Sequence, residues 1–258
     1  MNRIEKVFRK LKAENKKAFI PYVMAGDPSL ERTAEIVLML EKCGADIVEL
    51  GVPFTDPVAD GPTIQRASEN ALKAGVTLRG VMRFVKELRQ RTLIPILLMT
   101  YYNPVFKYGE EAFVQDAVAA GVDGVIIPDL PPDEAGLLIP IARKAKFATV
   151  FLLAPTSTED RITKVVKASS GFIYYVSMIG ITGSRLMLDG SLRESLGAVR
   201  RITGKPVAVG FGVSNHEEAR LVSEFADGVI VGSAIVKRTN ESTESLEMFV
   251  NEMRKAIK

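Results

Sequence analysis

Short apolar runs that end on a glycine or a polar residue recur along the chain. Three of them, at 43–51, 120–129 and 225–233, share a glycine or small residue, then an aspartate, then a β-branched run. This pattern predicts the end of a helix, a tight turn and a buried parallel strand. Further runs of the same kind lie at 19–26, 94–102, 148–154, 171–177 and 206–212, which brings the predicted strands to eight.

Helical spacing of apolar residues marks the segments between these strands. It is clear at 30–44, 78–91, 110–121, 159–170 and 192–204. Eight alternating βα units in about 250 residues predict a (β/α)8 TIM barrel, here a single domain over residues 1–258. The charged amphipathic pattern of residues 1–17 predicts an extra N-terminal helix that caps the bottom of the barrel.

A doubly wound open sheet is the alternative architecture. Such sheets usually have fewer strands at this length and often begin with a glycine-rich dinucleotide-binding turn. The turn after the first predicted strand reads AGDPSL and lacks the GxGxxG spacing. The barrel is therefore favoured.

Composition narrows the function classes. The net charge is only +3, and the Lys and Arg residues are scattered without a basic block, which disfavours nucleic-acid binding. No 18-residue apolar span or signal peptide is evident, so we expect a cytoplasmic protein without membrane segments. The only cysteine, Cys43, excludes an intramolecular disulfide, and the only histidine, His216, is expected in the first turn of a helix. Acid–base chemistry must then fall to carboxylates, tyrosines or lysines.

Glu49 ends the second predicted strand, in the stretch ELGVPFTDPVADG. Barrel enzymes carry their active sites at the carboxyl ends of the strands. A carboxylate in that position is costly to desolvate, so its pKa should be raised and it could donate a proton near neutral pH. The alternatives are a solvated strand-end glutamate and a glutamate paired with a lysine.

The loop after Glu49 is long and rich in proline. Ten or so residues separate Glu49 from the next helical pattern, more than usual for a βα loop. Prolines in this stretch fix the backbone, so Asp56 and Asp60 should be held in place for catalysis. The alternatives are that Asp60 caps the following helix and that Asp56 belongs to an Asx turn.

Glycines mark the ends of the last three predicted strands. Residues 178–191 are expected to form a loop long enough for a lid, and Gly210, Gly212 and Gly232-Ser233 are expected at the ends of the next two strands. Backbone N–H groups at such positions can approach an anion, which predicts a phosphate site. The floor of the site would contain Tyr22, Tyr101 and Phe211, suited to an aromatic substrate or else simply part of the core.

These segments closely resemble the tryptophan synthase α-subunit family across essentially the whole chain. The most specific match is ELGVPFTDPVADGPTIQRA at 49–67, and IPYVMAGDPS (20–29), LLMTYYNPVF (97–106), GVIIPDLPPDEA (124–135), SMIGITGSR (177–185), AVGFGVS (208–214) and VIVGSAIVK (229–237) follow in the family's order. The resemblance implies retro-aldol cleavage of indole-3-glycerol phosphate to indole and glyceraldehyde 3-phosphate, without a metal or an organic cofactor.

Roles for particular residues follow from the resemblance. Glu49 would act as the general acid and could also accept the glycerol hydroxyl proton, while Asp60 would hydrogen-bond the indole N–H. Thr182 would touch Asp60 when the lid closes. The phosphate would be bound by Gly183, Gly210, Gly212, Gly232 and Ser233, and the indole pocket would be lined by Tyr22, Tyr101 and Tyr174 or Tyr175.

The resemblance also implies a partner, a pyridoxal-phosphate-dependent β subunit, in an α2β2 heterotetramer. Asp56 and Pro57, together with the loop 178–191, match elements at that contact. Three other functions stay open: a stand-alone indole lyase, a non-catalytic activator that senses a phosphate ligand, and another phosphate-binding barrel such as a phosphoribosyl isomerase. Intact Glu49 and Asp60 argue against the activator, and the loop PFTDPVADGP has no role in the isomerase.

Overall fold

A single parallel sheet forms the centre of the computed structural model, which describes residues 1–177, 190–210 and 212–258. Its strand order is β5-β4-β3-β2-β1-β9-β8-β7-β6. The strands are β1 (Ala18–Met24), β2 (Val48–Gly51), β3 (Ile96–Met99), β4 (Gly124–Ile126), β5 (Ala148–Val150), β6 (Leu152–Leu153), β7 (Ile173–Val176), β8 (Val207–Gly210) and β9 (Gly228–Val231). Only Phe151 separates β5 from β6, the two ends of this order, so the sheet closes into a barrel. The predicted (β/α)8 fold is confirmed, with its fifth strand interrupted once.

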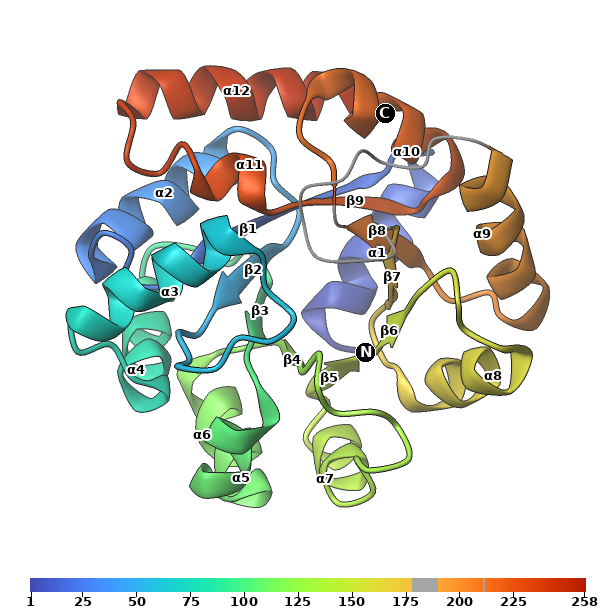
Figure 1. Cartoon of the computed structure of the whole chain (residues 1–258), viewed down its shortest axis with the longest axis horizontal. Coiled ribbons are helices and arrows are strands. Elements are labelled where there is room, and N and C mark those ends of the chain that lie inside the picture. The colour runs from blue at the N-terminus through green and yellow to red at the C-terminus, as the bar shows by residue number, and fades with distance from the viewer. Residues whose placement is uncertain (178–189, 211) are drawn as a thin grey trace.

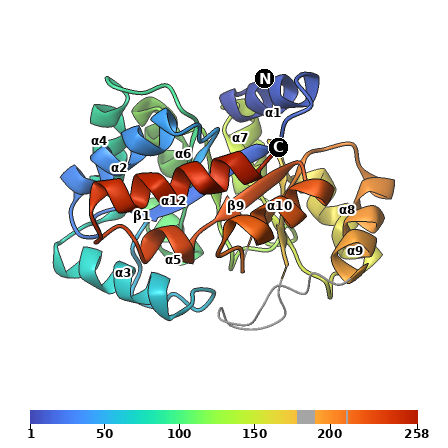
Figure 2. The same ribbon diagram turned by 90° about the horizontal axis from the view of Figure 1, so that it is seen from above.

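Helices surround the barrel (Figures 1 and 2). They are α1 (Arg3–Ala13), α2 (Leu30–Lys42), α3 (Pro62–Lys73), α4 (Leu78–Leu88), α5 (Tyr102–Tyr108), α6 (Glu110–Ala120), α7 (Leu138–Lys144), α8 (Glu159–Ala168), α9 (Gly190–Ile202), α10 (His216–Phe225), α11 (Ser233–Val236) and α12 (Thr243–Ala256). His216 is the first residue of α10, as expected, and Cys43 is buried.

The core has two layers because successive strand residues point to opposite faces. One cluster lies inside the barrel and includes Ile20, Ile47, Leu97, Ile126, Phe172, Tyr174 and Ile230. The other lies between the strands and the helices. The inner cluster also contains Ile4, Phe8 and Leu11 of α1. The predicted N-terminal helix therefore covers the lower opening of the barrel.

The repeated aspartate has a structural role at the lower end of the barrel. Each one lies just before a strand and accepts a hydrogen bond from the backbone N–H at the start of a neighbouring strand. The bonds are Phe19 N–H to Asp46 (2.8 Å), Ile96 N–H to Asp123 (2.9 Å) and Val207 N–H to Asp227 (2.9 Å). An arginine pairs with each carboxylate: Arg254 at 3.2 Å, Arg89 at 2.8 Å and Arg200 at 3.3 Å, respectively. Asp123 has a second, more exposed partner in Arg3 at 3.0 Å. The sequence repeat thus fixes the register of adjacent strands.

Candidate active site

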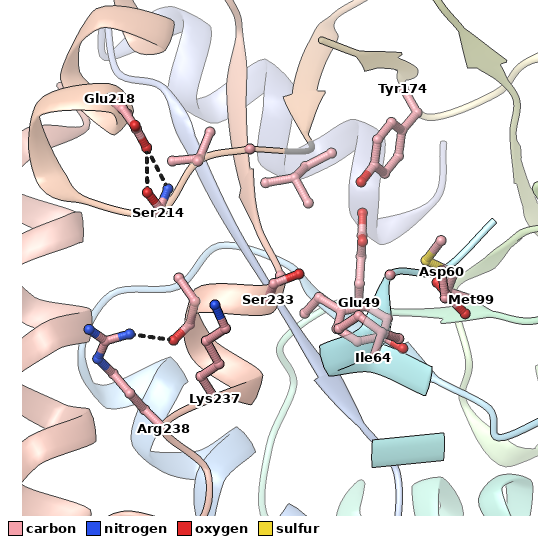
Figure 3. A pocket seen from close by; sticks show the side chains of 17 residues that line it. Glu49, Asp60, Ile64, Met99, Tyr174, Ser214, Glu218, Ser233, Lys237 and Arg238 are labelled. Carbon is pink, nitrogen blue, oxygen red and sulfur yellow. Dashed lines mark hydrogen bonds between the residues drawn. The ribbon is translucent and has the colours of Figure 1, made fainter. Parts of the chain in front are cut away.

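A cavity of about 460 Å³ opens at the carboxyl end of the barrel. Figure 3 shows the side chains that line it: Glu49, Asp60 and Tyr174 lie toward one end, and the polar side chains that follow β8 and β9 lie toward the other. The cavity therefore places a pair of carboxyl groups opposite a rim that includes glycine and serine residues. A cavity at the carboxyl ends of the strands is in the usual place for the active site of a barrel enzyme.

Glu49 occupies the inner face of β2, two residues beyond Ile47 of the inner core. Its side chain is 0% exposed, and neither carboxyl oxygen has a hydrogen-bond partner among the residues that the structure describes. Burial raises the pKa of Glu49 well above its usual value. The two alternatives, a solvated glutamate and a lysine-paired glutamate, are therefore wrong. A buried carboxyl group that stays protonated and faces a cavity can deliver a proton to a bound molecule.

Asp60 reaches the same cavity from the loop after β2. The Tyr101 hydroxyl donates a hydrogen bond to Asp60 Oδ2 at 3.0 Å and accepts one from the Ala59 N–H at 3.0 Å. Burial raises the pKa of Asp60 to about 6, although the Tyr101 hydrogen bond opposes this shift. The N-cap of α3 is Gly61, so the helix-cap interpretation of Asp60 is wrong. Near neutral pH, Asp60 is mostly ionised, whereas burial favours the protonated form of Glu49, so the two carboxyl groups are suited to different tasks.

Helix α3 and Tyr101 hold the loop of residues 52–61 in place. Ser68 accepts a hydrogen bond from the Phe54 N–H at 2.9 Å and donates one to the Phe54 carbonyl at 3.0 Å. Gln65 donates to the Asp60 carbonyl at 2.8 Å, and the Phe54 ring stacks on Tyr101 with centroids 5.3 Å apart. The predicted rigidity of this loop thus comes from side-chain contacts as well as from its prolines. Asp56 lies on the exposed part of the loop, with Pro57 half-buried beside it.

Two tyrosines on the inner face line the cavity, Tyr22 of β1 and Tyr174 of β7. Each hydroxyl lies over a glycine of the next strand: a Cβ on Gly51 would overlap the Tyr22 hydroxyl, and one on Gly210 would overlap that of Tyr174. Burial, together with the nearby carboxylates, raises the pKa of both tyrosines, which therefore stay neutral. Gly210 thus contacts Tyr174 and does not itself line the cavity.

The expectation that Tyr175 could line the pocket is wrong. Tyr175 is the next residue on the strand after Tyr174, so it points to the opposite face and packs in the cluster between strands and helices. Tyr101 is not in direct contact with the cavity either and acts on it through Asp60. The predictions for Thr182, Gly183 and Phe211 lie outside the described residues.

The rim of the cavity is built from the segments after β8 and β9. Gly212, Gly232 and Ser233 all line it, as the sequence predicted. Gly212 has a φ of 89°, a backbone conformation that favours glycine. Three charged residues at the rim were not predicted: Glu218, Lys237 and Arg238. Lys237 lies four residues after Ser233, so the two side chains are on the same face of a helix. The sequence would have predicted Lys237 at the rim only if the short helix α11 had been predicted.

The described part of the chain offers no cluster of three or more His, Cys, Asp or Glu side chains arranged to hold a metal ion. None of its helices combines the length and the apolar character needed to cross a membrane.

The fold, with a cavity at the carboxyl ends of its strands, is that of an α/β-barrel enzyme. A family model described as tryptophan synthase alpha chain matches residues 8–258. The tryptophan synthase alpha chain of Geotalea daltonii is 50% identical over 100% of this chain and 98% of its own length, and that of Geobacter sulfurreducens is 47% identical over 100% and 99%. The chain belongs to the tryptophan synthase alpha chain family.

Solved structures agree with this assignment. Tryptophan synthase subunit alpha from Legionella pneumophila superposes with a TM-score of 0.92 at 39% identity, covering 100% of this chain and 98% of that one. A chain in the tryptophan synthase structure from Mycobacterium tuberculosis gives a TM-score of 0.93 at 38% identity, covering 99% and 98%. The barrel is therefore shared over its whole length.

Proposed function

We propose that the chain catalyses the alpha reaction of tryptophan synthase, the retro-aldol cleavage of indole-3-glycerol phosphate to indole and glyceraldehyde 3-phosphate. Membership of the family over the full chain supports this activity. The observation that carries the chemistry is the unpartnered, fully buried carboxyl group of Glu49 in the same cavity as Asp60.

The two carboxyl groups have different tasks in the proposed reaction. Glu49 donates its proton to C3 of the indole ring, which creates a cationic ring system. Asp60 accepts a hydrogen bond from the indole N–H and stabilises the positive charge that develops there. The bond between C3 and the glycerol chain then breaks, and its electrons restore the aromatic ring. The adjacent hydroxyl becomes the aldehyde and returns its proton to Glu49.

The rest of the cavity would hold the two ends of the substrate. We assign the indole end to the side of Tyr22 and Tyr174, and the phosphate to the backbone N–H groups of Gly212, Gly232 and Ser233. Family resemblance adds Thr182 and Gly183 to this proposal, and the sequence pattern adds Phe211. Gly210 would contribute by making room for the Tyr174 hydroxyl.

A β subunit is the proposed partner, as expected for the family, in an α2β2 assembly that carries pyridoxal phosphate on the partner. Asp56 and Pro57 lie beside Val58, whose side chain is 79% exposed, and Phe106 after the next strand is 65% exposed. Apolar side chains so exposed at neighbouring strand ends suit a protein contact. The cytoplasm is the proposed location.

Indole release from indole-3-glycerol phosphate tests the proposal directly. We expect the isolated chain to release indole, and a β subunit to accelerate it strongly. Equal rates with and without a β subunit would instead support a stand-alone lyase, and no release under either condition would favour a non-catalytic activator.

The variant Glu49→Gln tests the acid. It should keep its affinity for glycerol 3-phosphate but lose turnover by about 10²–10⁴-fold, the range typical of a general acid. An unchanged rate would rule out the proton donor assigned here.

A further inference from the structure

Lys237 stands beside the part of the rim that carries Ser233. Its backbone N–H donates to the Ser233 carbonyl at 3.0 Å, which places it one helical turn further along the chain. Helical side chains lean toward the N-terminal end of their helix, so the Lys237 side chain extends back toward Gly232 and Ser233. Figure 3 shows Lys237 and Ser233 on the same side of the cavity that both line.

The other charged groups of the rim are already engaged. Arg238 donates to the Ala234 carbonyl at 2.8 Å, and its guanidinium lies 4.0 Å from the centre of the Phe249 ring. Glu218 accepts hydrogen bonds from the Ser214 N–H and hydroxyl at 2.7 and 2.8 Å. Within residues 1–177, 190–210 and 212–258, no carboxylate forms an ion pair with Lys237. Its ammonium group is therefore available to a ligand.

We propose that Lys237 binds the substrate's phosphate group directly, as the side-chain cation of a site whose other donors are backbone N–H groups. This inference rests on the proposed function, which places the phosphate at Gly232 and Ser233. An ammonium group binds phosphate as a point charge with charge-assisted hydrogen bonds. Lys237 thereby favours phosphorylated substrates over uncharged ones. The affinity of the cavity for the indole part of the substrate does not depend on Lys237.

The test compares three variants of the full chain. Lys237→Gln removes the charge and Lys237→Arg retains it. Lys73→Gln is the matched control, because Lys73 is an exposed lysine in the last turn of α3 and does not line the cavity. Calorimetry gives the dissociation constants of glycerol 3-phosphate and of indole for each protein. Steady-state assays give kcat and KM for indole-3-glycerol phosphate.

For Lys237→Gln we expect the dissociation constant of glycerol 3-phosphate to rise about tenfold, while that of indole stays the same. KM should rise by a similar factor with kcat nearly unchanged, because the phosphate contact is the same in the ground and transition states. Added salt should weaken glycerol 3-phosphate binding less in this variant than in the wild type. Lys237→Arg should recover most of the loss, and Lys73→Gln should match the wild type.

Wild-type affinity for glycerol 3-phosphate in Lys237→Gln would overturn the inference. Equal weakening of indole binding would do so as well, since it would indicate a distorted cavity, and so would an equal effect of Lys73→Gln. These results leave the proposed function intact if the wild type cleaves indole-3-glycerol phosphate. A wild type that neither cleaves this substrate nor binds glycerol 3-phosphate would overturn both.

Discussion

Replacing Asp123 by alanine should destabilise the barrel more than the same change at Asp46 or Asp227. All three carboxylates accept a backbone N–H from a neighbouring strand and pair with an arginine, but their side chains differ in exposure: 5% for Asp123, 21% for Asp46 and 37% for Asp227. The three positions thus share a strand hydrogen bond and an arginine partner, while burial varies. Asp123 also pairs with Arg3 at 3.0 Å, but this arginine is 45% exposed, so the extra pair contributes only about 0–1 kcal/mol.

The size of each loss of stability depends on the groups that remain without a partner once the aspartate is replaced by alanine. At position 123 it leaves Arg89, only 11% exposed, without its counter-charge, and burial already lowers the pKa of that guanidinium. Breaking such a pair costs about 3–5 kcal/mol. At position 227 the ion pair is exposed and contributes about 0–1 kcal/mol, so the loss is mainly one backbone hydrogen bond, about 1–2 kcal/mol. Asp46 should lie between, near 2 kcal/mol, because burial raises its pKa and offsets part of the attraction to Arg254.

Urea titration followed by far-UV circular dichroism measures the series. The midpoint should fall most for Asp123→Ala and least for Asp227→Ala, with an unchanged slope. Indole release without urea should stay near the wild-type rate, since all three residues lie at the lower end of the barrel. Equal losses at the three positions, or the reverse order, would refute the link between burial and stability made here.

Three further outcomes follow from the cavity. The value of kcat/KM should rise with pH through about 6 as Asp60 ionises. Tyr101→Phe should move this rise to higher pH, because the Tyr101 hydrogen bond lowers the pKa of Asp60. An unchanged pH profile in Tyr101→Phe would count against that role of Tyr101. Since folding raises the pKa of Asp60 from 3.8 to about 6, its ionisation destabilises the folded state increasingly from pH 3.8 upward and fully above 6. Asp60→Asn should therefore raise the urea midpoint at pH 8 but hardly at pH 4, and equal shifts at both pH values would contradict this. Gly51→Ala should displace Tyr22 and lower kcat/KM by about 10–100-fold. Gly197→Ala on α9 should not, because its Cβ would meet only the Arg201 side chain, at 3.9 Å; normal kinetics for Gly51→Ala would show that Tyr22 can move freely.

Much of the fold could be predicted because a parallel barrel buries its strands on both faces, which leaves apolar runs that the sequence displays openly. The same property hides which residues point inward, so sequence could not choose between Tyr174 and Tyr175. It also blurs the ends of strands. In the run at 94–102, strand β3 ends at Met99, because Tyr102 begins α5 and donates its N–H to Asp129 at 2.9 Å.

The candidate site was predictable where a residue contradicts its surroundings. Glu49 is the one acid among the apolar residues 47–50, and Asp60 lies in a loop that is longer and richer in proline than a simple connection needs. Lys237 gave no such signal, because a lysine after a short apolar run is common on any helix surface. The hydrogen bond between Tyr101 and Asp60 spans 41 positions and depends on the barrel bringing adjacent strand ends together, which local pattern does not reveal.

The aspartate–arginine pairs at the strand starts have a consequence for how such a protein can change over evolutionary time. The aspartate–arginine pairs hold neighbouring strands together at the start of each strand. The residues of the candidate active site lie at the opposite end of the strands. Insertions or exchanges in the upper connections can then alter which molecule is processed without first having to rebuild the scaffold. The lower end of the barrel could thus stay the same while the reaction catalysed at the upper end changes.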